Sequence, residues 1–292
     1  MTDAATPTPD RTRHAAHKSV LAACALAIAS LDSATVEAQR SGLRATAQAR
    51  NTTNARSGRD ARRATLPGVH PPSNPGDPER LDLPGMAGAY FYRPSAGGRQ
   101  RVLVYLHARG ANPKEGCRRW HESTPRFGWL VCPIGHHPHE RGGATRQWRN
   151  DAGYARRESI AAIERLGALF PRRVQRHDNV VMGFSEGAYV GMNVGLQEPQ
   201  TFPRWLIIAP NDGYIDGEAE RVRRLAQSSA RVYLITGRHD EIYREALLAE
   251  QRLVRALGRR RVKHRIMDHA GHELPPEFVP VTRRALLWLT AR

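Results

Sequence analysis

The stretch NVVMGFSEGAYVGMN, residues 179–193, decides the fold of this chain. It begins with an apolar run typical of a buried strand, reaches Gly-Phe-Ser-Glu-Gly, and continues in small residues that favour a helix. In this context a G-x-S-x-G pattern places a serine nucleophile on a sharp turn. The two glycines are required because neighbouring chain must pass close to a strained backbone. We predict that Ser185 is this nucleophile, at a helix N-terminus whose free N–H groups face developing negative charge.

The first 38 residues are typical of a secretory signal peptide. Basic side chains precede the apolar run 20–31, and small residues stand at the cleavage position near residue 38. A lipid anchor at Cys24 is one alternative, but Lys18 leaves almost no apolar chain before it. A disordered tail is the other. The apolar run is short for a membrane span, so we expect export to the periplasm or the medium without a stable membrane anchor.

The cysteine content agrees with export. The chain has three cysteines, and removal of Cys24 with the signal peptide would leave Cys117 and Cys132, an even number as oxidising compartments favour. Cys132 ends an apolar run and Cys117 lies in the segment before it. A disulfide between them would therefore staple one crossover, and two unpaired buried thiols are the alternative.

The chain is strongly basic, with a formal net charge of +17. Such a charge can indicate a nucleic-acid partner or an anionic membrane surface. However, we find no basic stripe interleaved with aromatic residues and no nucleic-acid-binding motif. Nearly all the basic residues are arginine, which the codon bias of a G+C-rich genome explains equally well. We therefore expect no nucleic-acid partner.

Composition divides the rest of the chain in two. Residues 39–80 are rich in Arg, Ala, Thr, Asn, Gly and Pro and poor in large apolar residues. They would bury too little apolar surface to offset the entropy of ordering, so we predict a disordered spacer. The folded catalytic domain is expected to span residues 81–292.

Apolar runs and helical patterns alternate along this domain, which predicts an α/β fold with a mostly parallel central sheet and helices on both faces. In such sheets the functional site lies beyond the carboxyl ends of the strands. The expected strands are 87–93, 101–107, 129–133, 179–184, 205–210, 232–237 and 262–267. The expected helices are 151–170, the segment from 185 to 198, 217–228, 241–257 and 277–290.

A serine nucleophile needs a base, and the base needs an orienting carboxylate. On this scaffold the chain order must be serine, then acid, then histidine. Asp240 follows a strand in the segment TGRHD, and His272 follows the last strand in DHAGHE. We therefore predict a catalytic triad of Ser185, Asp240 and His272, with His272 on a flexible loop just before a helix.

Neighbouring residues of the same chemistry are the alternatives. Glu241 adjoins the predicted acid but is expected to open a helix that points elsewhere. Asp212 and Asp216 lie one strand earlier in the chain and could serve as the acid. His269 and His239 are the alternative bases.

Acyl transfer also needs hydrogen-bond donors for the oxyanion, and removing one costs about 3 kcal/mol of transition-state stabilisation. One donor should be the N–H of Glu186, the residue after the nucleophile. The other should come from the loop LHARG, residues 106–110, which follows an early strand.

These motifs resemble those of the α/β-hydrolases. Over roughly residues 85–292 the chain is similar to secreted esterases of the polyhydroxybutyrate-depolymerase-like and dienelactone-hydrolase-like kinds. The resemblance implies the α/β-hydrolase fold, and it assigns the second oxyanion N–H to Arg109. In such families the loop usually reads Leu-His-Gly-x-Gly, whereas Ala108 replaces the first glycine here. The motifs that carry the resemblance are LHARG at 106–110, GFSEG at 183–187, GRHD at 237–240 and Gly-His at 271–272.

The loop 133–150 invites a separate interpretation. Its segment HHPHE, residues 136–140, has side chains that suit zinc. Ligands so close in sequence need a dedicated turn to converge on one ion, so we expect no metal. We interpret the loop instead as lying beside the substrate, with His107 and Trp148 as substrate contacts. Trp148 and Arg149 would then form an aromatic or cationic wall, and a solvated loop is the alternative.

The sequence thus predicts an exported serine hydrolase that needs no cofactor and cleaves a carboxylic ester, small or polymeric, through an acyl-enzyme. A serine peptidase of the same fold is one alternative. Such enzymes usually carry a propeller or a large cap, for which this chain has no room. A catalytically silent binding protein is another, and the presence of all three triad residues in the required order argues against it.

Overall fold

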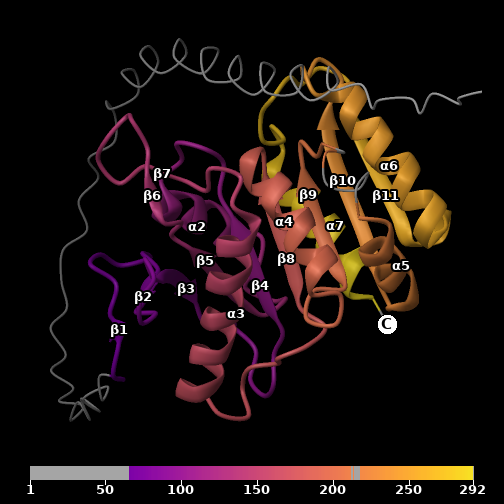
Figure 1. Ribbon diagram of the computed structural model, residues 1–292. Helices are drawn as coiled ribbons and strands as arrows, with labels where there is room; N and C mark the ends of the chain where they lie inside the picture. The colour runs from indigo at the N-terminus through magenta and orange to yellow at the C-terminus, as the bar shows by residue number, and fades with distance from the viewer. Residues whose placement is uncertain (1–65, 212, 214–217, 292) are drawn as a thin grey trace, which may run out of the picture. The chain divides into compact units, whose positions relative to one another are not determined.

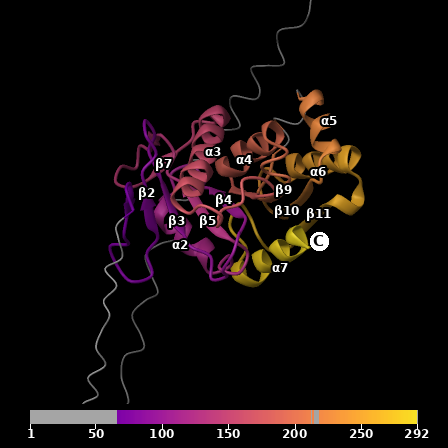
Figure 2. The ribbon, with the colours of Figure 1, turned by 90° about the horizontal axis from the view of Figure 1, so that it is seen from below.

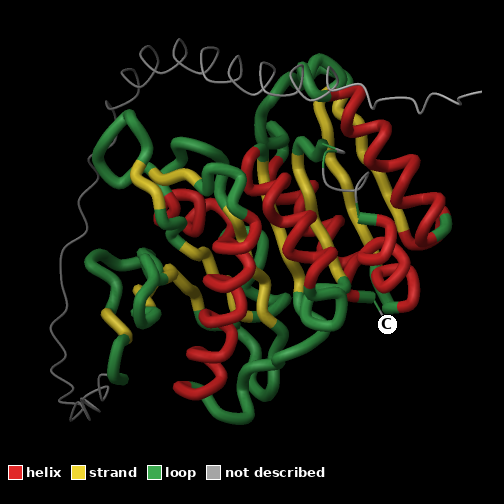
Figure 3. The backbone as a smooth tube through the Cα atoms, viewed as in Figure 1, coloured by secondary structure: helices red, strands yellow, loops and turns green. Residues whose placement is uncertain are grey.

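The computed structural model of the chain describes residues 66–211, 213 and 218–291. The predicted signal peptide and residues 39–65 of the predicted spacer lie outside the described residues. From residue 102 onward, strands and helices largely alternate along the described chain, as Figure 3 shows. No helix in it combines the length and apolarity needed to cross a membrane.

Nine strands of the described chain form the central sheet. In space they follow the order β1-β2-β3-β5-β4-β8-β9-β10-β11 (Figure 1). All adjacent pairs from β5 to β11 are parallel, whereas β1, β2 and β3 are joined antiparallel at one edge. The strands are β1 (Val69–His70), β2 (Glu79–Leu81), β3 (Ala89–Tyr92), β4 (Val102–Leu106), β5 (Trp129–Pro133), β8 (Val180–Phe184), β9 (Arg204–Ile208), β10 (Arg231–Gly237) and β11 (Val262–Met267).

Helices cover both faces of this sheet, as predicted. Figures 1 and 2 show α3, α4, α5 and α6 on one face and α2 and α7 on the other. The helices are α2 (Pro113–His121), α3 (Ala152–Leu169), α4 (Glu186–Gln197), α5 (Ala219–Gln227), α6 (Tyr243–Leu257) and α7 (Phe278–Thr290).

The core lies in two layers, one on each face of the sheet. Along β4, Val102, Val104 and Leu106 pack on the face of α3 to α6, and Leu103 and Tyr105 on the face of α2 and α7. Because successive side chains of a strand point to opposite faces, a strand covered on both faces must be apolar throughout. This burial explains the continuous apolar runs of the sequence.

The folded part begins earlier than the predicted boundary at residue 81. Val69 of β1 pairs with Leu81 of β2. Between these strands Asp77 is buried and lies 2.7 Å from Lys114 Nζ, and Tyr92 donates a hydrogen bond to the carbonyl of Gly76. Backbone pairing and this ion pair hold residues 66–80, which their composition alone did not indicate.

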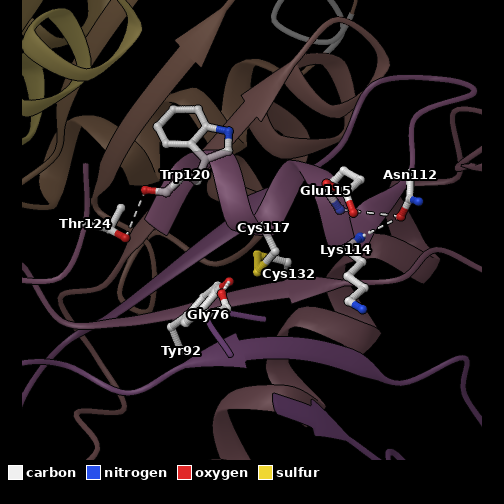
Figure 4. The surroundings of a disulfide bond; sticks show 9 residues. All are labelled: Gly76, Tyr92, Asn112, Lys114, Glu115, Cys117, Trp120, Thr124 and Cys132. Atoms are coloured by element: carbon white, nitrogen blue, oxygen red, sulfur yellow. Dashed lines mark hydrogen bonds between the residues drawn. A yellow bond between two sulfur atoms is a disulfide. The ribbon is translucent and has the colours of Figure 1, made fainter. Parts of the chain in front are cut away.

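Helix α2 is an element that we did not predict. The side chain of Asn112 accepts hydrogen bonds from the N–H groups of Lys114 and Glu115, which caps the helix (Figure 4). Pro113 stands at the first helical position, where a missing N–H costs nothing. The Asn-Pro pair was therefore a signal for this helix.

Helix α2 is fastened to the sheet by a disulfide. Cys117, on its buried face, is bonded to Cys132 of β5, and their Cα atoms lie 5.8 Å apart (Figure 4). The pairing is the predicted one. Closing a loop of this size stabilises the folded state by about 3 kcal/mol in the chain-entropy model.

Candidate active site

Ser185 lies at the sharp turn between β8 and α4. Its backbone has φ 56° and ψ −122°, a left-handed conformation that non-glycine residues rarely adopt. Such a conformation costs about 1–3 kcal/mol and persists only where its surroundings enforce it. One such constraint is the hydrogen bond from the Ser185 N–H to the carbonyl of Ile208, at the end of β9.

Two glycines make the turn possible. A Cβ atom on Gly183 would lie 2.2 Å from the carbonyl oxygen of Gly187, and one on Gly187 would lie 2.0 Å from that of Leu106. Any side chain at either position would therefore collide with backbone. The steric reason given for the glycines of the pattern is confirmed.

The structure brings Ser185, His272 and Asp240 together in one hydrogen-bonded chain. His272 Nε2 lies 2.9 Å from Ser185 Oγ, and His272 Nδ1 lies 3.0 Å and 3.1 Å from the two carboxylate oxygens of Asp240. The three residues follow β8, β11 and β10 respectively, so three different strand ends supply them. The arrangement can carry a proton from the hydroxyl to the imidazole.

The loops that carry the acid and the histidine are packed backbone against backbone. The His239 N–H donates to the carbonyl of Ala270, at 3.0 Å. A Cβ atom on Gly237 would lie 2.3 Å from the carbonyl oxygens of Ala270 and Gly271. Asp240 is oriented by the N–H of Ile242, which donates to its carboxylate. Close contact between the two loops therefore fixes the imidazole against the carboxylate.

The pKa of His272 is shifted by opposing effects. Burial alone would lower it, but the hydrogen bond and the negative charge of Asp240, with a smaller contribution from Glu241, together outweigh burial. The pKa of His272 therefore lies above the usual value for histidine. A more basic imidazole is a stronger proton acceptor for the serine hydroxyl.

Three of the alternative acids and bases differ from the triad residues in being exposed. Glu241, His239 and His269 are exposed. Asp268, beside His269, lies 2.7 Å from the guanidinium of Arg238. The remaining alternatives, Asp212 and Asp216, fall outside the described residues. Among the described groups, the hydrogen bonds of His272 join Ser185 to Asp240 only.

The predicted oxyanion donors, Glu186 and Arg109, lie on two segments beside the serine. Glu186 is the first residue of α4, where an N–H has no acceptor within the helix. Arg109 lies in the loop after β4, which is held at its end by a hydrogen bond from the Gly110 N–H to the carbonyl of Arg146.

The side chain of Glu186 has a second environment, which sequence reasoning missed. Its carboxylate is buried and accepts four hydrogen bonds, two from the Arg109 guanidinium at 3.0 and 3.2 Å. The others come from the N–H groups of Trp148, at 2.9 Å, and Asn150, at 3.2 Å. An acidic residue inside the buried first turn of an otherwise apolar helix was the available signal.

His107 and Trp148 do not lie on an open surface, contrary to their prediction as substrate contacts. Trp148 is fully buried, and its indole N–H donates to the carbonyl of His107. The ring nitrogens of His107 lie 2.8 Å from the carbonyl of Ala108 and 3.0 Å from that of Ile134. Burial lowers the pKa of His107 and outweighs these hydrogen bonds. Both side chains are therefore held inside the fold by hydrogen bonds to backbone carbonyls of the loops 106–110 and 133–150.

Comparison with solved structures finds the same architecture in known hydrolases. Esterase PE8 superposes on 68% of this chain and 97% of its own, with a TM-score of 0.55 and 18% identity. The Bacillus cereus carboxylesterase covers 70% and 94%, with a TM-score of 0.52 and 13% identity. Porphyromonas gingivalis dipeptidyl peptidase 4 covers 73% of this chain but only 35% of its own, with a TM-score of 0.51 and 16% identity. The chain has the α/β-hydrolase fold. No protein-family model matches the sequence, and no curated protein matches it either.

Within this α/β-hydrolase fold, the loop 133–150, here called the histidine-rich loop, forms a small hairpin of β6 (His137–Pro138) and β7 (Arg146–Gln147). His136 stacks on Tyr154 of α3, with ring centroids 3.8 Å apart, whereas His139 lies against Gly110. The rings of His136 and His137 also lie close together, with centroids 3.6 Å apart. Within the described ranges no group of three or more His, Cys, Asp or Glu residues could hold a metal ion.

One buried acid of the α/β-hydrolase core was not anticipated. Glu158 on α3 is fully buried, accepts a hydrogen bond from the Gly135 N–H at 3.2 Å, and has one carboxyl oxygen without a partner among the described residues. Burial, only partly offset by hydrogen bonds from backbone N–H groups, raises its pKa to about 8. Glu158 is therefore mostly protonated at neutral pH. Its hydrogen bond from Gly135 holds the start of the histidine-rich loop against α3.

Proposed function

We propose that the chain is a serine hydrolase that cleaves carboxylic esters through an acyl-enzyme. The observation that carries this proposal is the continuous hydrogen-bonded chain from Ser185 through His272 to Asp240. The strained turn at Ser185 is further support, because a half-buried hydroxyl held at a helix N-terminus suits attack on a carbonyl. Esterase PE8 and the Bacillus cereus carboxylesterase share the fold.

In the first half of the reaction Ser185 Oγ attacks the ester carbonyl carbon, and its proton passes to His272 Nε2. The carbonyl oxygen becomes an oxyanion, which the N–H groups of Arg109 and Glu186 would hold. Asp240 keeps the Nδ1–H tautomer and stabilises the imidazolium. His272 then gives the proton to the leaving alkoxide, which departs as the alcohol and leaves an acyl-enzyme.

In the second half a water molecule attacks the acyl carbon. His272 takes a proton from that water as the new C–O bond forms. The second tetrahedral intermediate collapses when the proton returns to Ser185 Oγ, which releases the carboxylic acid. The enzyme is regenerated, and no redox step or cofactor is needed to balance the reaction.

A serine peptidase is the second candidate, since dipeptidyl peptidase 4 shares this fold. This chain spans about a third of that protein, so most of that peptidase has no counterpart in the match. Ester hydrolysis needs no additional peptide-selecting element. Esters are therefore the preferred substrate class.

The decisive experiment compares wild type with Ser185→Ala on p-nitrophenyl esters of increasing acyl length. We expect hydrolysis by wild type and none above background by the variant, with unchanged circular dichroism. Dipeptide p-nitroanilides in the same assay address the peptidase alternative. Wild-type turnover retained in Ser185→Ala would refute the assignment, and cleavage of the anilides alone would favour the peptidase.

We further propose that the chain is exported. The Cys117–Cys132 disulfide supports an oxidising compartment, and the first 38 residues have the pattern of a signal peptide. Mass spectrometry of secreted protein without reductant should give a chain that begins near Gln39 with both cysteines oxidised. Two free thiols in the secreted protein would contradict the first argument, and retention of residues 1–38 the second.

A further inference from the structure

The oxyanion donors of the proposed reaction come from segments far apart in the chain. Arg109 and Glu186 are 77 residues apart, one on the loop after β4 and the other at the start of α4. The side chains of these same two residues meet, with Arg109 Nη2 3.0 Å and Nε 3.2 Å from Glu186 Oε1. We propose that this ion pair is a positioning device, which sets the spacing of the two donors and cancels the Glu186 charge beside the oxyanion.

Burial makes this contact restrictive. The Glu186 side chain is only 3% exposed, and a buried carboxylate is costly unless donors surround it. Its donors are the Arg109 guanidinium and the N–H groups of Trp148 and Asn150. Each donor belongs to a loop rather than to a helix or strand. The charge of Glu186 thus holds two loops against the first turn of α4.

The backbone on both sides of Arg109 is tied by hydrogen bonds, among them one from the Ala111 N–H to the carbonyl of Ala108, and the ion pair with Glu186 adds a contact through the side chain. Gly110 donates to the carbonyl of Arg146, and Arg146 donates to that of Ala111, so the end of the loop is tied to the hairpin. Arg109 itself is held through its side chain. Donors must lie within a few tenths of an ångström of the developing oxyanion to be effective, so a small shift of this loop would slow the reaction.

The sign of the charges gives the proposal a second consequence. A carboxylate at the start of α4 is favourable for the helix dipole, but near the serine it would repel a developing oxyanion. The guanidinium of Arg109 neutralises it. Removing Arg109 alone should therefore be worse than removing both charges together.

This inference rests on the proposed esterase function, and a double-mutant cycle tests it. The variants are Glu186→Gln, Arg109→Met and the double variant, measured on p-nitrophenyl acetate with kcat and KM determined separately. We expect Arg109→Met to lower kcat by about 100-fold, the loss typical of one missing donor, with KM changed by less than about threefold. The double variant should be more active than Arg109→Met.

Matched controls separate positioning from general damage. Arg223 and Glu220 form an exposed ion pair on α5, 2.7 Å apart, and Arg223→Met with Glu220→Gln should leave kcat unchanged. A phosphonate transition-state analogue should lose affinity in Arg109→Met in proportion to kcat. Should Arg109→Met fail to fold, Arg109→Lys is the second variant. It keeps the positive charge but has no planar guanidinium with two donor nitrogens, and we expect a smaller loss of kcat.

The outcomes are distinct. Folded variants with wild-type kcat, or losses that simply multiply in the double variant, would overturn the positioning role. Wild-type protein that neither hydrolyses the esters nor reacts with a fluorophosphonate at Ser185 would instead refute the proposed function. A rescued double variant would support both.

Discussion

The hydroxyl oxygen of Ser185 lies 2.9 Å from Nε2 of His272, although 87 residues separate them in the chain. Proton transfer requires this distance, and the folded chain already provides it. The contact depends on two backbone approaches, of Gly187 to β4 and of Gly237 to the histidine loop. Sheet packing therefore positions the reacting groups more than local sequence does.

Two histidines in the last loop allow a matched comparison. His272→Ala should reduce turnover by several orders of magnitude, because no base would then accept the serine proton. His269→Ala should have little effect, since His269 is exposed and the described hydrogen bonds of the serine lead to His272. Kinetics on one p-nitrophenyl ester, with melting temperatures for both variants, would check this. An essential His269 would mean that the base has been misassigned.

The pH dependence of the reaction follows from the raised pKa of His272. The neutral imidazole is the base, so kcat/KM should rise with pH through an apparent pKa above the usual 6.5 for histidine. Asp240→Asn removes the charge that raises this pKa. The rising part of the pH profile of kcat/KM should therefore move to lower pH, and the maximal rate should fall. Asp268→Asn, at an exposed acid nearby, should leave the profile in place. An apparent pKa of kcat/KM that stayed unchanged in Asp240→Asn would contradict the proposed pairing of His272 with Asp240.

Glu158 should make the stability of the fold depend on pH. Its pKa is about 8 in the folded state against about 4.5 in an unfolded chain, so the unfolded state releases this proton first as pH rises. The free energy of unfolding therefore falls progressively as pH rises from about 4.5 to 8. Glu158→Gln should melt a few degrees above wild type at pH 8 and about equally at pH 4. Glu164→Gln, an exposed change on the same helix, should show no such difference.

Two glycines of α4 should respond in opposite ways to alanine. In Gly187→Ala the new methyl group would lie 2.0 Å from the Leu106 carbonyl, so we expect strong destabilisation and loss of activity. In Gly191→Ala its nearest neighbours would be side-chain atoms at 3.6 Å, an ordinary contact. That variant should be as stable as wild type or better, because alanine favours helices by up to about 1 kcal/mol. Thermal unfolding of both would test the steric account of the turn.

The parts of the fold that the sequence predicts are those in which local pattern and tertiary burial agree. The β4 run Val102–Leu106 is apolar throughout because both of its faces are covered, and each predicted strand of this type is present. The elements β1 and β2 were missed because they are short, and because backbone pairing and the Asp77–Lys114 ion pair hold them together with only a few core side chains such as Leu81.

Within the site, the order of the residues and their positions at strand ends were sufficient to predict that Ser185, Asp240 and His272 lie together. Side-chain surroundings were not predictable in the same way. Trp148 could equally have faced a substrate or the core from its sequence position, and only tertiary packing buries it. The carboxylate of Glu186 likewise acquires its partners from loops that are distant in sequence.

The left-handed backbone at Ser185 sets two selective pressures against each other. Glycine adopts such a conformation freely, so Ser185→Gly should recover part of the cost of about 1–3 kcal/mol while deleting the hydroxyl. The most stable residue at this position is thus one that cannot react. In any screen of variants for heat resistance alone, this codon would tend to drift toward glycine, and only a requirement for turnover would keep a serine there.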